Sequence, residues 1–244
     1  MKALLLAAGY GSRLGQHTKT KPKCLIDVNG QTMLDHWLFK LEALGVESFI
    51  INTHYKSEQV ENHISNHLLN SKITLDFEPE LLGTAGTVAR HSHELINSDC
   101  FIVHVDNYCQ DNLQALLKSH FARPESTMLT MLTFTTSTPQ TCGIVEVDQE
   151  GKLIGFYEKQ IAPPSNMANG AVFIASPAFF EFIKEDDRVN LDLSRDIVPT
   201  LLGKIFCVHT EAYFEDIGIE EKLFNTRAKI QASMQQNSVQ TGGA

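Results

Sequence analysis

The stretch Leu4–Lys23, LLLAAGYGSRLGQHTKTKPK, decides how the rest of the chain is organised. It opens with three leucines, which are the apolar run of a buried parallel strand, and closely spaced glycines follow them. A backbone without Cβ atoms lets N–H groups approach a phosphate. The same loop carries four basic side chains, Arg13, Lys19, Lys21 and Lys23. A strand, a glycine turn and fixed positive charge together are typical of a nucleoside phosphate site.

Two commoner glycine motifs do not fit this loop. The dinucleotide-binding pattern G-x-G-x-x-G has Leu14 at its third glycine, and the next predicted strand ends in Asn52 without an acid for a ribose. The P-loop pattern requires a glycine five residues after Gly9, where Leu14 again stands. A plain strand-to-helix turn with incidental lysines therefore stays open as an alternative for the loop taken by itself.

Composition limits the classes of protein that the chain can belong to. A hydrophobic share of 43% over 244 residues is ample for the core of one large α/β domain. The net charge of −9 argues against a broad nucleic-acid surface, so any anion site must be local. No apolar run has the length of a membrane span or of a secretion signal, and the five cysteines lack C-x-x-C spacing. We therefore expect a cytoplasmic protein with reduced thiols.

The predicted elements alternate along the first part of the chain. A helix over 33–44, a strand over 48–52, a helix over 57–67 and a strand over 73–78 continue the βαβ rhythm, which predicts a parallel sheet covered by helices. From residue 143 the rhythm changes to a β-hairpin, with strands over 143–147 and 153–158. A helix broken at Pro199 is predicted over 192–202. The last helix is predicted over 220–230, and the Gln/Ser/Gly-rich tail 231–244 is expected to fray.

Two further stretches place polar residues where a ligand could bind. Thr84 is a plausible N-cap, and the small residues that follow it suit a helix start that something approaches closely. A helix capped by Thr84 and packed through Gly86 is the plainer reading. Asp106 follows the most apolar predicted strand, where an acid needs water, a cation or a metal, although a turn-forming aspartate is equally compatible. Asp216 is a second acid on an extended segment.

Taken together, these motifs resemble those of the sugar-1-phosphate nucleotidyltransferases, from Met1 to about Ile230. The family's order of motifs is matched by Leu6–Lys23 (L-A-A-G-x-G-x-R-L…P-K), Leu82–Thr87 (L-G-T-A-G), Val105–Asn107 (G-D), Phe156–Lys159 (F-x-E-K), Asn169–Gly170 (N-x-G) and Phe214–Gly218 (W-x-D-x-G). The resemblance implies a glycosyltransferase-A-like, Rossmann-like α/β fold, with a mixed central sheet flanked by helices and a small β-hairpin subregion. It also implies one catalytic domain over residues 1–230.

The resemblance further implies an activity: a nucleoside triphosphate and a sugar 1-phosphate would give a nucleotide sugar and pyrophosphate. Arg13 would neutralise the leaving pyrophosphate, and Lys23 would bind the α-phosphate or the sugar phosphate. Asp106 and Asp216 would hold Mg²⁺, so the implied catalytic residues are Arg13, Lys23 and Asp106. The triphosphate would be wrapped by Ala7, Ala8, Gly9, Gly11 and Ser12, and the nucleoside would lie against Thr84 and Gly86. The sugar phosphate would contact Asn107, Gly143, Glu158, Lys159 and Asn169.

The segment Leu82–Gly86 looks most like that of guanylyltransferases acting on mannose or heptose 1-phosphate, with Glu80 as an acceptor for guanine N–H groups. Uridylyl or cytidylyl transfer to another sugar phosphate stays an alternative, as does a non-catalytic sugar-nucleotide-binding subunit. A metal-dependent glycosyltransferase would need D-x-D, which Asp106–Tyr108 does not supply. The expected partners are the two substrates, without nucleic acid or membrane, and the chain is expected to be a monomer or a homodimer.

Overall fold

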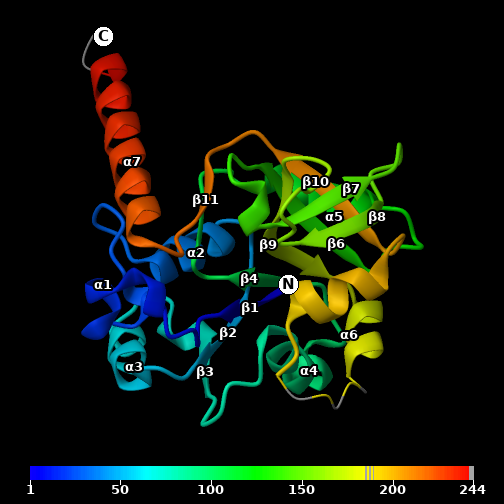
Figure 1. The fold of residues 1–244 in the computed structure, drawn as a ribbon. Coiled ribbons are helices and arrows are strands. Elements are labelled where there is room, and N and C mark those ends of the chain that lie inside the picture. Colours follow the sequence, from blue (N-terminus) through cyan, green and yellow to red (C-terminus); the bar gives the residue numbers. More distant parts are fainter. Residues whose placement is uncertain (185, 187, 189, 242–244) are drawn as a thin grey trace.

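A mixed sheet runs through the centre of the molecule. The computed structural model describes residues 1–184, 186, 188 and 190–241. Within these residues the sheet has nine strands, with the order β10-β6-β9-β4-β1-β2-β3 along its main path (Figure 1). The main-path strands are β1 (Lys2–Leu6), β2 (Ser48–Thr53), β3 (Ile73–Phe77), β4 (Cys100–His104), β6 (Leu129–Thr135), β9 (Met167–Ala175) and β10 (Ile205–Thr210). This arrangement confirms the predicted mixed α/β fold.

Strands β1 to β4 are parallel, whereas β9 runs antiparallel between β4 and β6. Leu6 at the end of β1 pairs with Asn52 of β2 and with His104 of β4. The carboxyl ends of these three strands therefore lie at one level of the sheet. In parallel α/β sheets this edge is where ligands bind.

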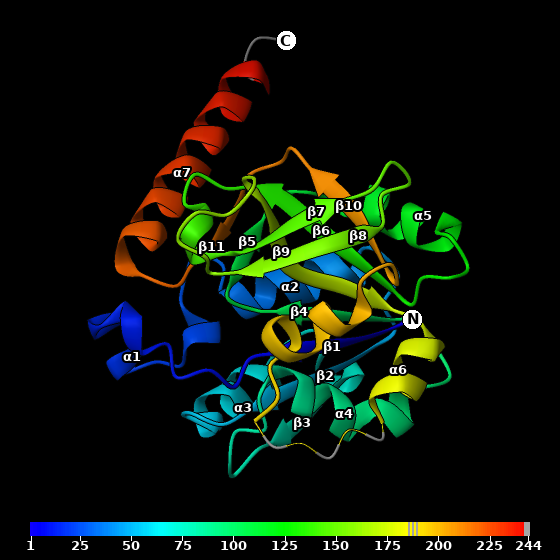
Figure 2. The ribbon, with the colours of Figure 1, turned by 45° about the vertical axis from the view of Figure 1, so that its right-hand side comes forward.

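Helices cover both faces of the sheet, which explains why β1 is apolar without interruption. Alternate residues of β1 face opposite sides: Leu5 packs in one core and Leu4 in the other. The first core takes side chains from α2 (Met33–Glu42), α3 (Ser57–Ser65) and α5 (Gln114–Ala122). The second takes them from α4 (Thr84–Leu95) and α6 (Pro177–Ile183), as the turned view shows (Figure 2).

Two antiparallel additions complete the fold. The predicted hairpin is present as β7 (Gly143–Val147) and β8 (Leu153–Glu158), and β7 also pairs with β9. The short strands β5 (Asn107–Cys109) and β11 (Phe214–Asp216) pair with each other in a separate two-stranded sheet. This second pairing joins the segment after β4 to a segment more than a hundred residues later.

Three local predictions were wrong. The helix α7 (Glu220–Thr241) does not end near residue 230 but continues through the tail expected to fray, and it projects from the body of the molecule (Figures 1 and 2). Residues 242–244 lie outside the described part of the chain, and the domain boundary at 230 stays a prediction. The segment predicted as one broken helix over 192–202 is a π turn, Leu193–Ile197, followed by a 3₁₀ turn, Val198–Leu201.

The third error concerns Thr84, which is the first residue of α4 and not its N-cap. Gly83 occupies the cap position, and no side chain caps it. The Thr84 hydroxyl is engaged elsewhere: it donates to Asp192 Oδ2 at 3.2 Å and accepts from the Leu193 N–H at 2.7 Å. A contact with residues more than a hundred positions away therefore displaces the local capping interaction.

The remaining sequence-based expectations concern thiols and membranes. The five cysteines all lie in the described part of the chain and all are free. Burial raises the pKa of the Cys24 and Cys207 thiols to about 12, so these side chains stay neutral. Among the described residues, no helix has both the length and the apolar character needed to cross a membrane.

Candidate active site

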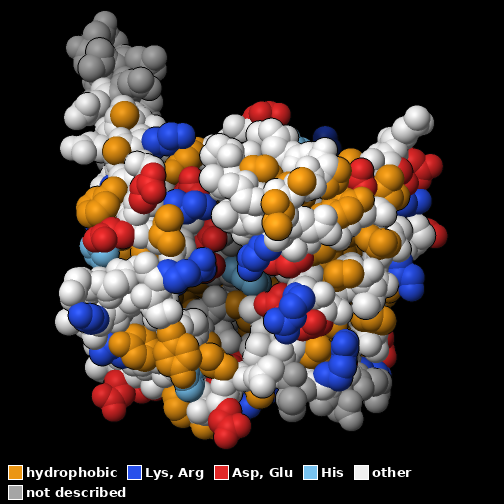
Figure 3. All heavy atoms as spheres, viewed as in Figure 1, with side chains coloured by type: hydrophobic (Ala, Val, Ile, Leu, Met, Phe, Trp, Pro, Cys, Tyr) orange, Lys and Arg blue, Asp and Glu red, His pale blue; other side chains and the backbone are white. Residues whose placement is uncertain are grey.

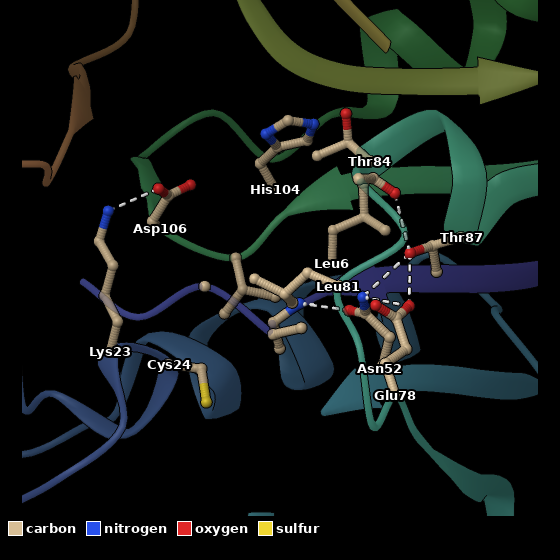
Figure 4. Close-up of a pocket in the computed structure, with 15 residues that line it drawn as sticks. Leu6, Lys23, Cys24, Asn52, Glu78, Leu81, Thr84, Thr87, His104 and Asp106 are labelled. Atoms are coloured by element: carbon tan, nitrogen blue, oxygen red, sulfur yellow. Dashed lines mark hydrogen bonds and ion pairs between the residues drawn. The ribbon is translucent and has the colours of Figure 1, made fainter. Parts of the chain in front are cut away.

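A cavity of about 210 Å³ opens at the carboxyl ends of β1, β2 and β4. Figure 3 shows a hollow near the middle of this face, bordered by acidic and basic side chains. The close-up in Figure 4 shows the residues that line the cavity. They are Leu6, Ala7, Ala8, Gly9, Lys23, Cys24, Asn52, Glu78, Leu81, Gly83, Thr84, Thr87, His104, Val105 and Asp106.

The glycine loop after β1 is shaped by Gly11, whose φ of 64° is left-handed. A Cβ atom there would lie 2.8 Å from Thr18 Cγ2 and 2.9 Å from Lys23 Cβ. The missing side chain therefore lets the loop close tightly against Lys23. Leu14, fully buried in the 3₁₀ turn that follows, fixes the far side of the loop in the core.

Lys23 and Asp106 form an ion pair at one end of the cavity, with Nζ 2.5 Å from Oδ2. Lys23 is only 8% exposed, so its ammonium group is held in place beside the cavity. Burial works against a charged Asp106, but the adjacent Lys23 ammonium lowers the pKa of this carboxyl below its usual value. Asp106 is therefore ionised at neutral pH, and the ion pair supplies fixed charge of both signs to the cavity.

Asp216 lies beside Asp106, as the sequence motifs implied. It pairs with Asn107 in the β5–β11 ladder, and the next residue, Ile217, donates its N–H to the Asp106 carbonyl oxygen at 2.9 Å. Burial and the negative charge of Asp106 raise the pKa of Asp216 above its usual value. Two carboxylates that repel each other in this way would be stabilised by a shared cation.

The donor set of this pair fits Mg²⁺. Both residues offer oxygen atoms only, and the described residues contain no cluster of three or more His, Cys, Asp or Glu side chains suited to a metal. A hard cation that keeps water and phosphate among its ligands needs only one or two protein carboxylates. Arg13 borders the same site: a Cβ atom at Gly218 would lie 3.3 Å from Arg13 Nη2 and 3.4 Å from each Asp216 carboxylate oxygen.

A hydrogen-bonded network that the sequence reasoning missed forms the opposite end of the cavity. Asn52 Oδ1 accepts from the Ala7 N–H at 2.7 Å, and Asn52 Nδ2 donates to Glu78 Oε1 at 3.0 Å. The Thr87 hydroxyl donates to the same Glu78 oxygen at 2.6 Å, and Glu78 Oε2 accepts from the Leu82 N–H at 3.2 Å. Glu78 is only 1% exposed, and the groups that donate to its carboxylate within the described part of the chain are all neutral; Figure 4 shows Glu78 with Asn52 and Thr87. The network ties the glycine loop to β2, β3 and α4.

The loop before α4 requires Gly83. Its φ is 79°, and a Cβ atom there would lie 2.3 Å from the Leu191 carbonyl oxygen. Thr84 lines the cavity as predicted. Gly86 does not, because it lies two residues further along α4, against Leu82. Glu80 is exposed and does not line the cavity, which is instead lined by Glu78 two residues earlier.

Four of the five residues expected to bind a sugar phosphate, Gly143, Glu158, Lys159 and Asn169, lie in or next to β7, β8 and β9. A Cβ atom at Gly143 would come within 2.7 Å of Glu158 Oε2, so this glycine makes room for the carboxylate. Lys159 is 65% exposed and its Nζ lies 3.1 Å from Glu158 Oε1. Asn169 Nδ2 donates to Ser194 Oγ at 3.1 Å.

Asn107 forms hydrogen bonds that hold neighbouring segments of the chain together. Its side chain is buried, and Nδ2 donates to the Gly170 carbonyl oxygen at 3.1 Å. Its own carbonyl oxygen accepts from Trp37 Nε1 at 2.8 Å. Asn107 thus fixes the segment after β4 between β9 and α2, and a direct contact with a sugar phosphate stays a prediction.

The structure brings together six of the predicted nucleotide-site residues around the cavity: Ala7, Ala8, Gly9, Lys23, Thr84 and Asp106. Ser12 and Arg13 are exposed and do not line it. Sequence reasoning missed four polar lining residues, Asn52, Glu78, Thr87 and His104. Asn52 ends a predicted buried strand, and that position was the available signal. His104 was predicted to lie one residue before the end of the strand over 101–105, and it ends β4 in the structure.

Comparison with known proteins finds one matching family model and several related sequences. The family model described as "Nucleotidyl transferase" matches residues 2–233. The catalytic subunit beta of mannose-1-phosphate guanylyltransferase from Xenopus tropicalis is 30% identical over 229 residues, which are 89% of this chain and 61% of that protein. The bifunctional protein GlmU from Methanocaldococcus jannaschii is 26% identical over 223 residues, 89% of this chain and 51% of that one. The chain thus spans about half to three fifths of these two relatives.

A solved structure supports the fold independently. The crystal structure of HddC from Yersinia pseudotuberculosis complexed with GMP-PN superposes with a TM-score of 0.77 at 24% sequence identity. The match covers 94% of this chain and 99% of that one. At this identity the match shows a shared fold, in agreement with the sheet order and the antiparallel additions described above.

Proposed function

The chain belongs to the nucleotidyl transferase family, and from that premise we propose that it transfers a guanylyl group from GTP to a mannose- or heptose-type sugar 1-phosphate. The products would be a GDP-sugar and pyrophosphate. The observation that carries the proposal is the meeting of Lys23, Asp106 and Asp216 at one end of a cavity bordered by a glycine loop.

The proposed chemistry needs charge neutralisation more than it needs a base. The oxygen of a sugar phosphate is already nucleophilic, so the barrier lies in the negative charge at the phosphorus and on the departing pyrophosphate. Lys23 would bind the α-phosphate from its fixed position beside the glycine loop, and Arg13 would neutralise the pyrophosphate. Mg²⁺, held by Asp106 and Asp216, would supply additional positive charge to the phosphates.

The preference for guanine rests on Glu78. Its carboxylate lines the cavity, and among the described residues Oε2 accepts only the Leu82 N–H, so it has capacity to accept another hydrogen bond. Guanine presents two N–H donors on one edge, whereas uracil and thymine flank their single N–H with carbonyl oxygens that a carboxylate repels. The names of the Xenopus guanylyltransferase and of the HddC complex with GMP-PN agree with this choice. We therefore assign the guanine contact to Glu78 in place of Glu80.

The sugar would occupy the side formed by β7, β8 and β9. Glu158 would accept hydrogen bonds from sugar hydroxyls, and Asn169 would donate hydrogen bonds to them. The exposed Lys159 would pair with the sugar phosphate. The room that Gly143 leaves for the Glu158 carboxylate supports this arrangement.

Pyrophosphate release tests the proposal directly. We expect turnover to be highest with GTP when each of GTP, UTP, CTP, ATP and dTTP is combined with a panel of sugar 1-phosphates in the presence of Mg²⁺. Mannose and heptose 1-phosphates should be the best acceptors. Turnover with UTP and none with GTP would reject the guanylyl assignment. Absence of pyrophosphate release with every pair would reject nucleotidyl transfer itself.

A further inference from the structure

His104 lines the cavity, but the proposed function gives it no task and it takes no part in the hydrogen-bonded network around Glu78. It ends β4, where it pairs with Leu6, and it precedes Asp106 by two residues. Its ring nitrogen Nε2 is enclosed and has no hydrogen-bond partner among the described residues. Enclosed polar atoms in folded proteins are nearly always paired, so an exception points to a partner that is bound only at times.

The position of His104 along the cavity indicates which part of a ligand it faces. Figure 4 shows Lys23 and Asp106 at one end, Glu78 and Asn52 at the other, and His104 between them. In a nucleoside triphosphate the ribose connects the base to the phosphates. If the phosphates bind near Lys23 and the base near Glu78, the ribose lies beside the middle of the cavity.

We propose that the His104 imidazole binds a hydroxyl of the nucleotide ribose and thereby selects ribonucleotides over deoxyribonucleotides. This inference rests on the proposed function, because it uses the proposed ends of the nucleotide. It concerns a contact with the substrate and gives His104 no part in the transfer step.

The chemistry of the two groups is well matched. A neutral imidazole has one nitrogen that donates and one that accepts, and a hydroxyl can do either. The contact therefore forms with either tautomer of His104. A site that is built to bind a hydroxyl discriminates against an analogue without it, because the polar group of the protein is then left unpaired.

Nucleotide binding measured by calorimetry, with Mg²⁺ present, tests the contact. The ligands are GTP, 2′-deoxyGTP and 3′-deoxyGTP, and the proteins are the wild type, His104→Phe and His104→Gln. The Phe variant keeps a planar ring without nitrogen atoms, whereas the Gln variant keeps a donor and an acceptor. His93→Phe, at an exposed position on α4, is the matched control.

We expect the wild type to bind GTP about 3- to 10-fold more tightly than at least one of the two deoxynucleotides, as the loss of one hydrogen bond predicts. His104→Phe should abolish that difference, His104→Gln should restore part of it, and His93→Phe should leave it unchanged. The proposal is overturned if the wild type binds all three nucleotides equally, or if His104→Phe weakens all three by the same factor. The latter result would show a packing role.

The design separates this inference from the proposed function. Nucleotide binding without any coupling between His104 and a ribose hydroxyl overturns the ribose contact alone. If GTP does not bind but another ribonucleoside triphosphate does, the guanine assignment fails, and the same deoxy series of that nucleotide tests the contact. If no nucleotide binds, both the proposed function and the ribose contact are overturned.

Discussion

Each end of the cavity contains a carboxylate that is shielded from water, and the two carboxylates are stabilised in different ways. At one end Asp106 is paired with the Lys23 ammonium at 2.5 Å and lies beside a second acid, Asp216. At the other end the Glu78 carboxylate accepts from the Asn52 amide, the Thr87 hydroxyl and the Leu82 N–H. The first end is held by charges and the second by neutral hydrogen bonds.

This difference suggests what each end is for. Charges that lie together at one end of a cavity can be redistributed when a phosphate or a cation enters, which suits the chemical step. A carboxylate fixed by neutral donors keeps its geometry, which suits recognition of a flat, neutral group such as a base. Mutations at the charged end should therefore act mainly on turnover, and mutations at the neutral end mainly on the choice of substrate.

The largest effect is expected from Lys23→Ala at the charged end. The change removes a fixed positive charge beside the reacting phosphate, so kcat/KM for the proposed transfer should fall about 100-fold or more. Asp106→Ala should cost a similar factor. Lys21→Ala, in the same loop but exposed, is the matched control and should stay near the wild-type rate. A Lys23→Ala enzyme with near-normal turnover, measured by pyrophosphate release, would remove the role given to this end.

A smaller and more selective effect is expected from Glu78→Gln at the neutral end. The amide replaces one acceptor oxygen with a donor, which opposes both guanine N–H groups and the donors that hold Glu78 in place. We expect kcat/KM with GTP to fall about 10-fold relative to that with UTP. Glu80→Gln is the control, because Glu80 is exposed outside the cavity.

The two glutamate variants also show which residue contacts the base: Glu80, as the sequence predicts, or Glu78, as we propose from the cavity. If Glu80→Gln changes the GTP-to-UTP ratio and Glu78→Gln does not, the sequence-based prediction for Glu80 is correct and the neutral end has no part in base selection. Thermal unfolding of both variants is needed alongside, since the loss of network hydrogen bonds at Glu78 also lowers stability.

The charged end could be predicted from sequence, whereas the neutral end could not. Lys23 lies in a motif in which glycines and charges stand together, and Asp106 directly follows the most apolar predicted strand, so local patterns indicate both residues. The neutral network joins residues from β2, β3 and α4 that share no motif, and only the parallel pairing of strands brings Asn52 to the level of Leu6. A polar residue at the end of a buried strand was the one available signal.

The prediction for Thr84 was wrong for the same reason. A local pattern of a threonine followed by small residues predicts a capped helix, but the Thr84 hydroxyl bonds to Asp192 and Leu193. Sequence patterns report on neighbours within about one helical turn, and this partner is distant. The alternation of strands and helices, in contrast, depends on local periodicity, and it predicted the sheet and the hairpin.

The smallest effect, Asp216→Asn, tests whether the charged end is strained in the absence of a cation. The pKa of Asp216 is raised by burial and by the charge of Asp106, so the ionised form costs stability in the folded protein. A group whose folded pKa is raised stabilises the fold below its unfolded pKa of about 4, and that contribution is lost as pH rises through the folded value.

Asparagine is neutral at every pH, so the variant avoids this cost. Without Mg²⁺, Asp216→Asn should unfold about 1–3 °C higher than the wild type at pH 7.5, and the difference should vanish near pH 3, where Asp216 is protonated. Added Mg²⁺ should stabilise the wild type more than the variant, because only the wild type keeps both carboxylates. A variant that is less stable than the wild type at pH 7.5 without Mg²⁺ would mean that Asp216 already has a sufficient partner in Arg13 or Lys222. In that case the charged end, like the neutral end, would be fully satisfied before any ligand binds.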